Sequence, residues 1–524
     1  MSPLARGLIG AGIGVALTVA AGAAIVAAPA DRPDPAVAHT ATGDLRGTVT
    51  DEVRTFQGIP YAAPPVDALR WEPPAPAADW DGERDATTPG AACPQPADLP
   101  ISMSPTDEDC LYLNVTTPAD ARPGDDLPVI VWIHGGSLTY GDGAGYGAAR
   151  LAEQGDVVVV TVNYRLGVFG FLSHPDLPGH TANLGLLDQR AAFEWVRANA
   201  TAFGGDAGNV TAMGQSGGGY SVCAQLASPG SAGLFDRAIV HSAGCVGSAD
   251  ATMDLDTARA NGVAIATAAE CDGADPATCL RAADTEALIA AAGGGHSDFR
   301  PVVDGDVLPT DLTEAFSTGE FHRVPVLYGS NRHEESGRLG GIEIATGTPL
   351  DAQGYLDQVT ATFGDDAPAV LAEYPPSDYA SPGEALTAVL TDANWSRHAW
   401  RTAETLSEYT PVYAFEITQS ESPWWRGMDR PSFPLGTGHM AEMAYLFEYP
   451  QLEDLDASQR RLSRDMIDYW TAFAAAGDPN HRGAPRWDHF TATAPYTQGL
   501  AADAHGIGES GFAEYHHLEF WAGR

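Results

Sequence analysis

The sequence predicts an α/β fold built on a large, mostly parallel sheet with helices on both faces. Residues 127–133 and 157–162 are continuous runs rich in β-branched side chains, as in strands that are buried on both faces. A third apolar run, residues 210–213, leads through a glycine-rich turn into a helical segment at 220–227. Residues 186–200 also have helical spacing. Strands that alternate with helices are typical of a parallel sheet, because parallel neighbours need long crossovers.

The rest of the chain is expected to extend the same sheet. Further strands are predicted over residues 56–61, 110–115, 237–242 and 324–329. The polar, proline-rich residues 31–41 are predicted to form a flexible N-terminal segment, a lead into the first strand of the domain. No internal repeat, low-complexity tract or long linker divides the chain, so residues 31–524 are predicted to form a single domain with large insertions.

The composition is strongly acidic, with 69 Asp and Glu residues against 28 basic ones and a formal net charge of −41. This charge argues against nucleic acids and anionic membranes as partners, because both are bound by basic patches. All 28 basic residues are arginines, which excludes lysine Schiff bases, Ser-Lys nucleophiles and a phosphate-loop lysine. No His/Cys cluster with metal-ligand spacing and no dinucleotide-binding glycine motif occurs, so we expect no metal and no cofactor.

The N-terminus has the features of an export signal. Arg6 precedes an uncharged, apolar run over residues 7–30, and Ala28-Pro-Ala30 offers a small-x-small cleavage site before Asp31. Residues 1–30 are therefore predicted to be a signal peptide, whose removal leaves a secreted protein with no stable membrane partner. Because the run is long for a signal peptide, an uncleaved N-terminal anchor is the alternative.

Six cysteines in an exported chain favour disulfides. They are Cys93, Cys110, Cys223, Cys245, Cys271 and Cys279. The first two flank a proline-rich loop and the last two bracket a short Asp/Gly/Pro segment, so both of these pairs have spacings that suit local bridges. The middle two are left over, and the sequence does not fix whether they form a third bridge or stay as buried thiols.

The strongest chemical signal is Gly214-Gln-Ser216-Gly-Gly218, a Gly-x-Ser-x-Gly pattern between a predicted strand and a predicted helix. In that context the serine lies on a sharp turn that lifts its hydroxyl above the sheet, near helical N–H groups that favour negative charge. Such a turn needs a strained serine backbone and small neighbours, which gives Gly214 and Gly218 a steric reason to be glycine. The pattern also arises by chance in glycine-rich chains, so the serine needs partners.

A nucleophilic serine requires a histidine that takes its proton and an acid that holds the histidine. The α/β-hydrolase fold supplies them in the chain order Ser, Asp or Glu, His, on loops after later strands. Ser330-Asn-Arg-His-Glu-Glu335 and the segment around His439 meet this demand. Ile133-His-Gly-Gly-Ser137 follows a buried strand, where the N–H groups of an oxyanion hole belong. These segments predict the α/β-hydrolase fold.

Five further segments carry distinctive residues. They are Glu108-Asp-Cys-Leu-Tyr-Leu-Asn-Val115, Trp132-Ile-His-Gly-Gly136, Asn163-Tyr-Arg-Leu-Gly-Val-Phe-Gly-Phe171, Asn183-Leu-Gly-Leu-Leu-Asp-Gln-Arg190 and Phe203-Gly-Gly-Asp206. On these segments the chain resembles the type-B carboxylesterases, the carboxylesterase and cholinesterase family, from Phe56 into its last hundred residues. The resemblance implies an esterase that transfers the acyl group of a small-molecule ester to water in two steps.

The resemblance also implies the catalytic residues. Ser216 is expected to be the nucleophile, His439 the general base and Glu334 the acid that orients the base. Glu335 is the alternative acid, because it stands where the family usually has glycine, and an alignment error of one residue would exchange the two glutamates.

The oxyanion N–H groups are implied to come from Gly136, Ser137 and Gly217. The family usually has glycine or alanine at the position of Ser137 and alanine at that of Gly217. Neither difference removes a backbone N–H group. Gln215 replaces the family's usual Glu beside the nucleophile and is expected to keep hydrogen bonds at a lower desolvation cost. Ser242 matches a serine that the family places near the acid and the base, although a plain serine at a strand end is the alternative.

The Cys93–Cys110 pair matches the family's first disulfide loop. In cholinesterases this loop carries a choline-binding tryptophan, whereas residues 94–109 contain no aromatic residue, which argues against choline specificity. Two alternatives stay open. One is a non-catalytic binding or adhesion protein on the same scaffold, since the family has members that lack the serine. The other is the same mechanism on a thioester, carbamate or lactone.

Overall fold

The computed structural model describes residues 34–97, 105–177, 181–294 and 299–524. The predicted signal peptide, residues 1–30, lies outside the described part. The chain from Pro35 to Arg524 forms one compact unit. Within the described ranges, every helix is too short or too polar to span a lipid bilayer.

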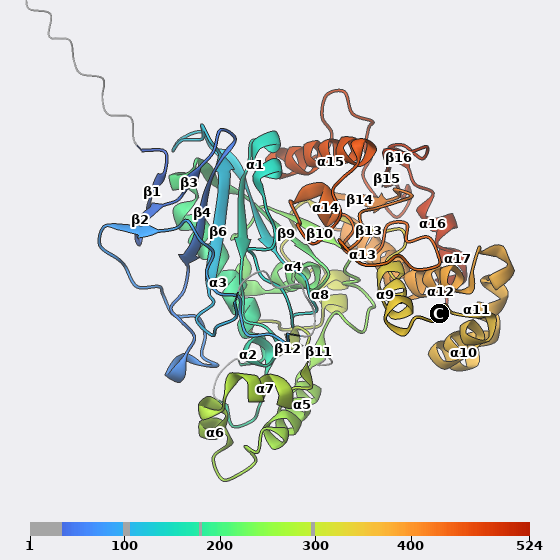
Figure 1. The fold of residues 1–524 in the computed structure, drawn as a ribbon, viewed down its shortest axis with the longest axis horizontal. Coiled ribbons are helices and arrows are strands. Elements are labelled where there is room, and N and C mark those ends of the chain that lie inside the picture. Colours follow the sequence, from blue (N-terminus) through green and yellow to red (C-terminus); the bar gives the residue numbers. More distant parts are fainter. Residues whose placement is uncertain (1–33, 98–104, 178–180, 295–298) are drawn as a thin grey trace, which may run out of the picture. The chain divides into compact units, whose positions relative to one another are not determined.

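An 11-stranded sheet is the centre of this unit (Figure 1). Its strand order is β16-β15-β14-β13-β10-β9-β7-β8-β6-β4-β3. In chain order the strands are β3 (Thr48–Val49), β4 (Val53–Pro60), β6 (Tyr112–Pro118), β7 (Leu127–Ile133), β8 (Val158–Val162), β9 (Gly205–Gln215), β10 (Arg237–His241), β13 (Val326–Asn331), β14 (Val412–Ile417), β15 (Thr497–Leu500) and β16 (Gly508–Glu509). Every neighbouring pair from β15 to β8 is parallel, and antiparallel pairs stand at both ends. The predicted, mostly parallel sheet is confirmed.

Helices cover both faces of the sheet. In β7, Val129, Val131 and Ile133 belong to one buried cluster, whereas Ile130 and Trp132 belong to the other. The first cluster includes residues of α3 (Leu184–Asn199), α4 (Gly217–Ala227) and α13 (Arg397–Ser407), and the second includes residues of α1 (Ala149–Gly155), α14 (Met443–Leu446) and α15 (Ala457–Ala476). Because burying one such apolar side chain contributes roughly 1.5–3 kcal/mol, a run without polar positions favours a strand with helices on both sides.

Smaller sheets and further helices extend the unit. β1 (Val37–Thr40), β2 (Gly43–Arg46) and β5 (Glu83–Asp85) form a three-stranded sheet, and β11 (Met253–Asp254) and β12 (Val302–Val303) form a two-stranded one. Further helices are α2 (Gly167–Phe171), α5 (Leu255–Ala268), α6 (Pro276–Ala282), α7 (Thr285–Ala291), α8 (Leu312–Thr318), α9 (Ser336–Thr346), α10 (Ala352–Phe363), α11 (Ala367–Glu373), α12 (Pro382–Thr391), α16 (Phe512–Tyr515) and α17 (Leu518–Trp521).

The prediction of a flexible lead over residues 31–41 is wrong for its second half. Val37–Thr40 forms β1, which pairs antiparallel with β2. Ala38 and Leu45, on the two paired strands, are both buried. The backbone hydrogen bonds of this pairing and the apolar contacts beneath it order a segment whose composition is typical of a loop.

The predicted and observed bounds of the strands agree best where the apolar run is continuous. β7 has the predicted bounds, and β8 begins one residue later than predicted. β9 begins at Gly205, before the predicted start at Val210. Its register with β7 shifts between Leu127 and Val129. This bulge accommodates polar residues of low strand propensity, which is why the apolar pattern did not reveal them.

All three disulfides form. Cys93 bonds Cys110, and Cys271 bonds Cys279, as predicted from the spacing. The third bridge joins the pair that the sequence left open: its first cysteine lies in α4 and its second follows β10. It therefore ties the helix after Ser216 to the segment that contains Ser242.

Candidate active site

Neighbouring parallel strands bring the predicted site residues to one edge of the sheet. β9 ends at Gln215, directly before Ser216, and β13 ends three residues before Glu334. β7, on the other side of β9, ends at Ile133, just ahead of the predicted oxyanion loop. Since these strands are parallel, their carboxyl ends lie at the same edge. The segment with His439 follows β14, the next strand beyond β13.

Ser216 occupies a strained turn between β9 and α4. Its φ of 56° and ψ of −123° lie outside the regions that side chains ordinarily adopt, and such strain costs roughly 1–3 kcal/mol. Its backbone N–H donates to the carbonyl oxygen of His241 at 2.9 Å. A Cβ at Gly218 would collide with the carbonyl oxygen of Ile133, and one at Gly214 with that of Gly218. The predicted strain and the need for small neighbours are both confirmed.

The imidazole of His439 lies against the carboxylate of Glu334. Its Nδ1 donates to Oε2 at 2.6 Å. The other carboxylate oxygen accepts from the hydroxyl of Ser242 at 2.6 Å and from the backbone N–H of Asn331 at 2.7 Å. Because Glu334 is buried and held by three donors, its orientation toward the histidine ring is fixed.

Glu335 turns away from His439. One of its carboxylate oxygens accepts from the indole N–H of Trp395 at 2.9 Å, and the other from Arg338 at 2.6 Å. The Trp395 ring in turn lies against the imidazole of His439, with ring centroids 4.7 Å apart. Trp395 is on the π-helical turn Asp392–Ser396 between α12 and α13. Sequence reasoning missed this residue, since no local pattern marks a contact that depends on two distant segments.

The electrostatic surroundings of His439 favour its protonated form. Burial is the largest single influence and disfavours the imidazolium, but the nearby carboxylates, Glu334 foremost, together outweigh it and raise the pKa of His439 above its usual value. Glu442 and Glu335 act in the same direction. Burial would raise the pKa of Glu442, yet its contacts, above all that with His241, lower it, so this buried carboxylate stays charged beside the site.

Two of the predicted oxyanion residues, Ser137 and Gly217, lie close together beside the turn at Ser216. A Cβ at Gly217 would lie 3.0 Å from the backbone nitrogens of Ser137 and Leu138, so the start of α4 contacts the loop after β7. Gly136 and Ser137 have φ angles of 107° and 54°. Within the described part of the chain, their N–H groups donate to no protein acceptor. The N–H of Gly217 is in the first turn of α4, where helix geometry leaves such groups without a helical partner.

The Gln215 side chain contacts the other nitrogen of the histidine ring. Its amide nitrogen lies 3.2 Å from His439 Nε2. Gln215 is 1% exposed, so solvent has almost no access to this side chain. Ser216 directly follows Gln215 at the end of β9, so the serine lies one residue from this contact with the histidine ring.

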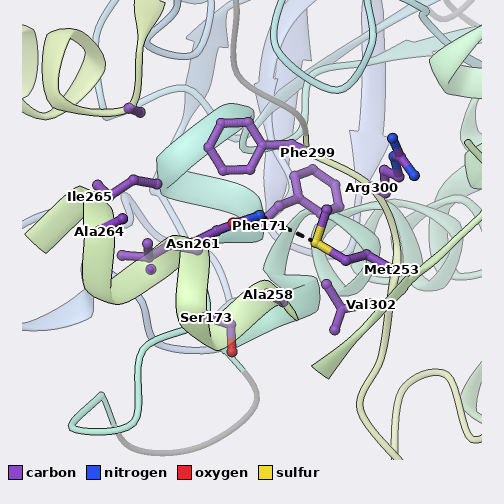
Figure 2. Close-up of a pocket in the computed structure, with 13 residues that line it drawn as sticks. Phe171, Ser173, Met253, Ala258, Asn261, Ala264, Ile265, Phe299, Arg300 and Val302 are labelled. Carbon is purple, nitrogen blue, oxygen red and sulfur yellow. Dashed lines mark hydrogen bonds between the residues drawn. The ribbon is translucent and has the colours of Figure 1, made fainter. Parts of the chain in front are cut away.

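A pocket of about 260 Å³ lies elsewhere, between α2 and α5 (Figure 2). Phe171, Phe299 and Met253 contribute to its wall, and Asn261 donates to the sulfur of Met253 at 3.7 Å. None of the predicted site residues lines this pocket, so it is separate from the candidate active site. Across the described ranges, no three His, Cys, Asp or Glu side chains are grouped so that they would hold a metal ion.

Comparisons with known proteins agree with this geometry. Residues 34–521 match the sequence model of the Carboxylesterase family. The para-nitrobenzyl esterase of Bacillus subtilis (strain 168) is 34% identical over 468 residues, which cover 85% of this chain and 90% of that protein. The fumonisin B1 esterase of Sphingopyxis macrogoltabida is 35% identical over 506 residues, 91% of this chain and 88% of that protein. The cocaine esterase of Oryctolagus cuniculus is 34% identical over 503 residues, with coverage of 88% and 91%.

Proposed function

The chain belongs to the carboxylesterase family and is a carboxylic ester hydrolase, and from this premise we propose that it is a serine esterase whose triad is Ser216, His439 and Glu334. The observation that carries the proposal is the 2.6 Å hydrogen bond from His439 Nδ1 to Glu334 Oε2, together with the strained backbone of Ser216, whose neighbour Gln215 contacts the same imidazole. A buried carboxylate in this position fixes the ring tautomer and leaves Nε2 as the base.

In the first half of the reaction, the ester of a small-molecule substrate acylates Ser216. The serine oxygen attacks the carbonyl carbon while Nε2 of His439 takes the hydroxyl proton. The N–H groups of Gly136, Ser137 and Gly217 stabilise the oxyanion that develops on the carbonyl oxygen. The protonated histidine then gives its proton to the leaving alcohol, and the acyl-enzyme is formed.

In the second half, water replaces the alcohol. His439 takes a proton from the water molecule, whose oxygen attacks the acyl carbonyl, and the same N–H groups hold the second oxyanion. Collapse of this intermediate releases the acid and returns the proton to Ser216. Glu334 lowers the free energy of both proton transfers, because its charge stabilises the imidazolium that each transfer creates.

The proposal is tested by removal of the nucleophile and the base. Ser216→Ala and His439→Ala are each expected to lower kcat on p-nitrophenyl esters by about 10⁴-fold, since the alcohol or its base is lost. A fluorophosphonate is expected to label the wild type at Ser216 and to leave Ser216→Ala unlabelled. Near-full activity of Ser216→Ala, or a folded wild type that resists the label, would favour a binding protein on the same scaffold.

We also propose that the enzyme is exported and works outside the cytoplasm, with residues 1–30 as the cleaved signal. The three disulfides support an oxidising compartment, where such bonds form and persist. N-terminal sequencing of protein from the culture medium is expected to begin at Asp31. Recovery of the intact chain from the cytoplasm alone would contradict export.

A further inference from the structure

Gln215 contacts the atom of His439 on which the proposed proton transfers depend. It is the last residue of β9 and is 1% exposed. Its side-chain nitrogen lies 3.2 Å from His439 Nε2, while the opposite ring nitrogen of the histidine bonds Glu334 at 2.6 Å. The imidazole is therefore held from both sides, by a carboxylate at Nδ1 and by an amide at Nε2.

The direction of the Gln215 hydrogen bond follows from the chemistry of the three groups. An ionised Glu334 only accepts, so Nδ1 of His439 carries the proton of the neutral ring. Nε2 then has a lone pair, and the amide NH₂ of Gln215 donates to it. This lone pair is also the one that must receive the proton of Ser216.

We propose that Gln215 is a positioning residue that donates to the Nε2 lone pair of His439 in the resting enzyme, favours the neutral ring and yields this lone pair to the hydroxyl of Ser216 when the serine gives up its proton. The inference rests on the proposed triad and deepens it. Once Nε2 is protonated it becomes a donor, and the NH₂ of Gln215 no longer has an acceptor there. The amide therefore favours the neutral ring over the imidazolium.

The packing beside Gln215 holds its amide in place. A Cβ at Gly135, in the loop after β7, would lie only 2.9 Å from the amide oxygen of Gln215. The backbone of this loop therefore packs closely against the side chain, and glycine is the residue that allows this approach.

The hydrogen bond donated by Gln215 acts on the protonation of His439 in the opposite direction to the charged groups that face the ring. Those groups are Glu334, Glu442 and Glu335, of which Glu442 also faces His241 and Glu335 also faces Arg338. The three carboxylates favour the imidazolium, whereas a hydrogen bond donated to Nε2 favours the neutral ring. Gln215 therefore keeps the histidine available as a base to a lower pH than the carboxylates alone would allow.

The test is the acid limb of the pH profile of kcat/KM on p-nitrophenyl acetate, which reports the free enzyme's base. Gln215→Met keeps the side-chain length and removes the donor, so its limb is expected to move to higher pH by about 0.5 unit. Gln215→Glu replaces the donor with a group that stabilises the imidazolium, and its limb is expected to move by about 1 unit or more. A merely structural role would lower kcat without a shift of either limb.

The matched control is Gln498→Met, because Gln498 is a fully buried glutamine on β15 that contacts none of the site residues. Its acid limb is expected to coincide with that of the wild type. The position of a limb does not depend on the concentration of active enzyme, so a partly folded Gln215 variant still gives a reading. Unshifted limbs in both Gln215 variants would overturn this inference alone, whereas full activity of Ser216→Ala would overturn the proposed triad.

Discussion

At the scale of single residues, two adjacent glutamates have opposite surroundings. Glu334 bonds His439, whereas Glu335 bonds Trp395 and Arg338. Both side chains are buried, with 1% and 6% exposure. The two residues lie in the turn between β13 and α9, where the chain changes direction, so one position separates the proposed acid beside His439 from a glutamate that holds the tryptophan.

We expect Glu334→Gln to lower kcat by about 10³- to 10⁴-fold, because an amide donor at this position favours the wrong tautomer of His439 and no longer stabilises the imidazolium. The measurement is kcat per active site, titrated with a fluorophosphonate. Glu335→Gln is the matched control, with the same chemical change one residue further on. Its loss is expected to stay below about 10-fold, and an equal loss in both variants would contradict the assignment of Glu334.

At the scale of elements, the bridge between Cys223 and Cys245 joins α4 to the segment after β10. Ser216 precedes α4, and Ser242, which bonds Glu334, lies in that segment. Ser242 has a φ of 50°, an unfavourable conformation that its surroundings must hold. The disulfide thus links α4, which follows Ser216, to the segment that contains Ser242, so it connects the two parts of the chain that hold these strained serines.

Removal of this bridge by Cys223→Ala with Cys245→Ala is expected to lower the free energy of unfolding by about 3 kcal/mol, since it spans 22 residues. The loop closed by Cys271 and Cys279 spans 8 residues, so the matching double variant is expected to lose roughly 1 kcal/mol less. Thermal unfolding of both variants gives the comparison. A larger loss from the shorter loop would contradict the chain-entropy account.

At the scale of the whole molecule, a buried ionic cluster ties the C-terminal segment to the sheet. His516 donates to Asp392 at 2.5 Å and to Glu416 of β14 at 2.9 Å. Arg332, two residues before Glu334, makes two further bonds of 2.9 Å to Glu416. Burial would lower the pKa of His516, but Asp392 and Glu416 outweigh it and raise the pKa to about 9.

We expect the stability of the protein to fall by roughly 3 kcal/mol as the pH rises from 6.5 to above 9. A pKa that is higher in the folded than in the unfolded state stabilises the fold fully below the unfolded value and ceases to do so above the folded one. The chain has no lysine and no free cysteine, so few other groups titrate in this window. Urea unfolding from pH 6 to 10 measures the effect.

The control for this pH dependence is His516→Gln, which removes the titrating ring and keeps a buried polar side chain. The variant is expected to be less stable than the wild type at pH 6 and to depend little on pH up to 9. If both proteins lost the same stability across this range, another group would be responsible.

The sequence by itself determined the features that depend on local pattern. Continuous β-branched runs predicted β7 and β8, and the glycines on either side of Ser216 predicted the strained turn. These predictions hold because a strand buried on both faces needs an unbroken apolar run, and a tight turn needs the smallest side chains. Two of the three disulfides were also predictable, since their loops are short and local.

Only the tertiary structure decided the contacts between distant segments. No prediction covered β14, whose apolar run is interrupted by Glu416, a charge that Arg332 and His516 neutralise from far along the chain. The placement of Trp395 on the imidazole and of the Gln215 amide on Nε2 likewise needs two segments to meet. The local sequence does not predict such contacts, because their free energy comes from residues that are brought together only when the whole sheet is assembled.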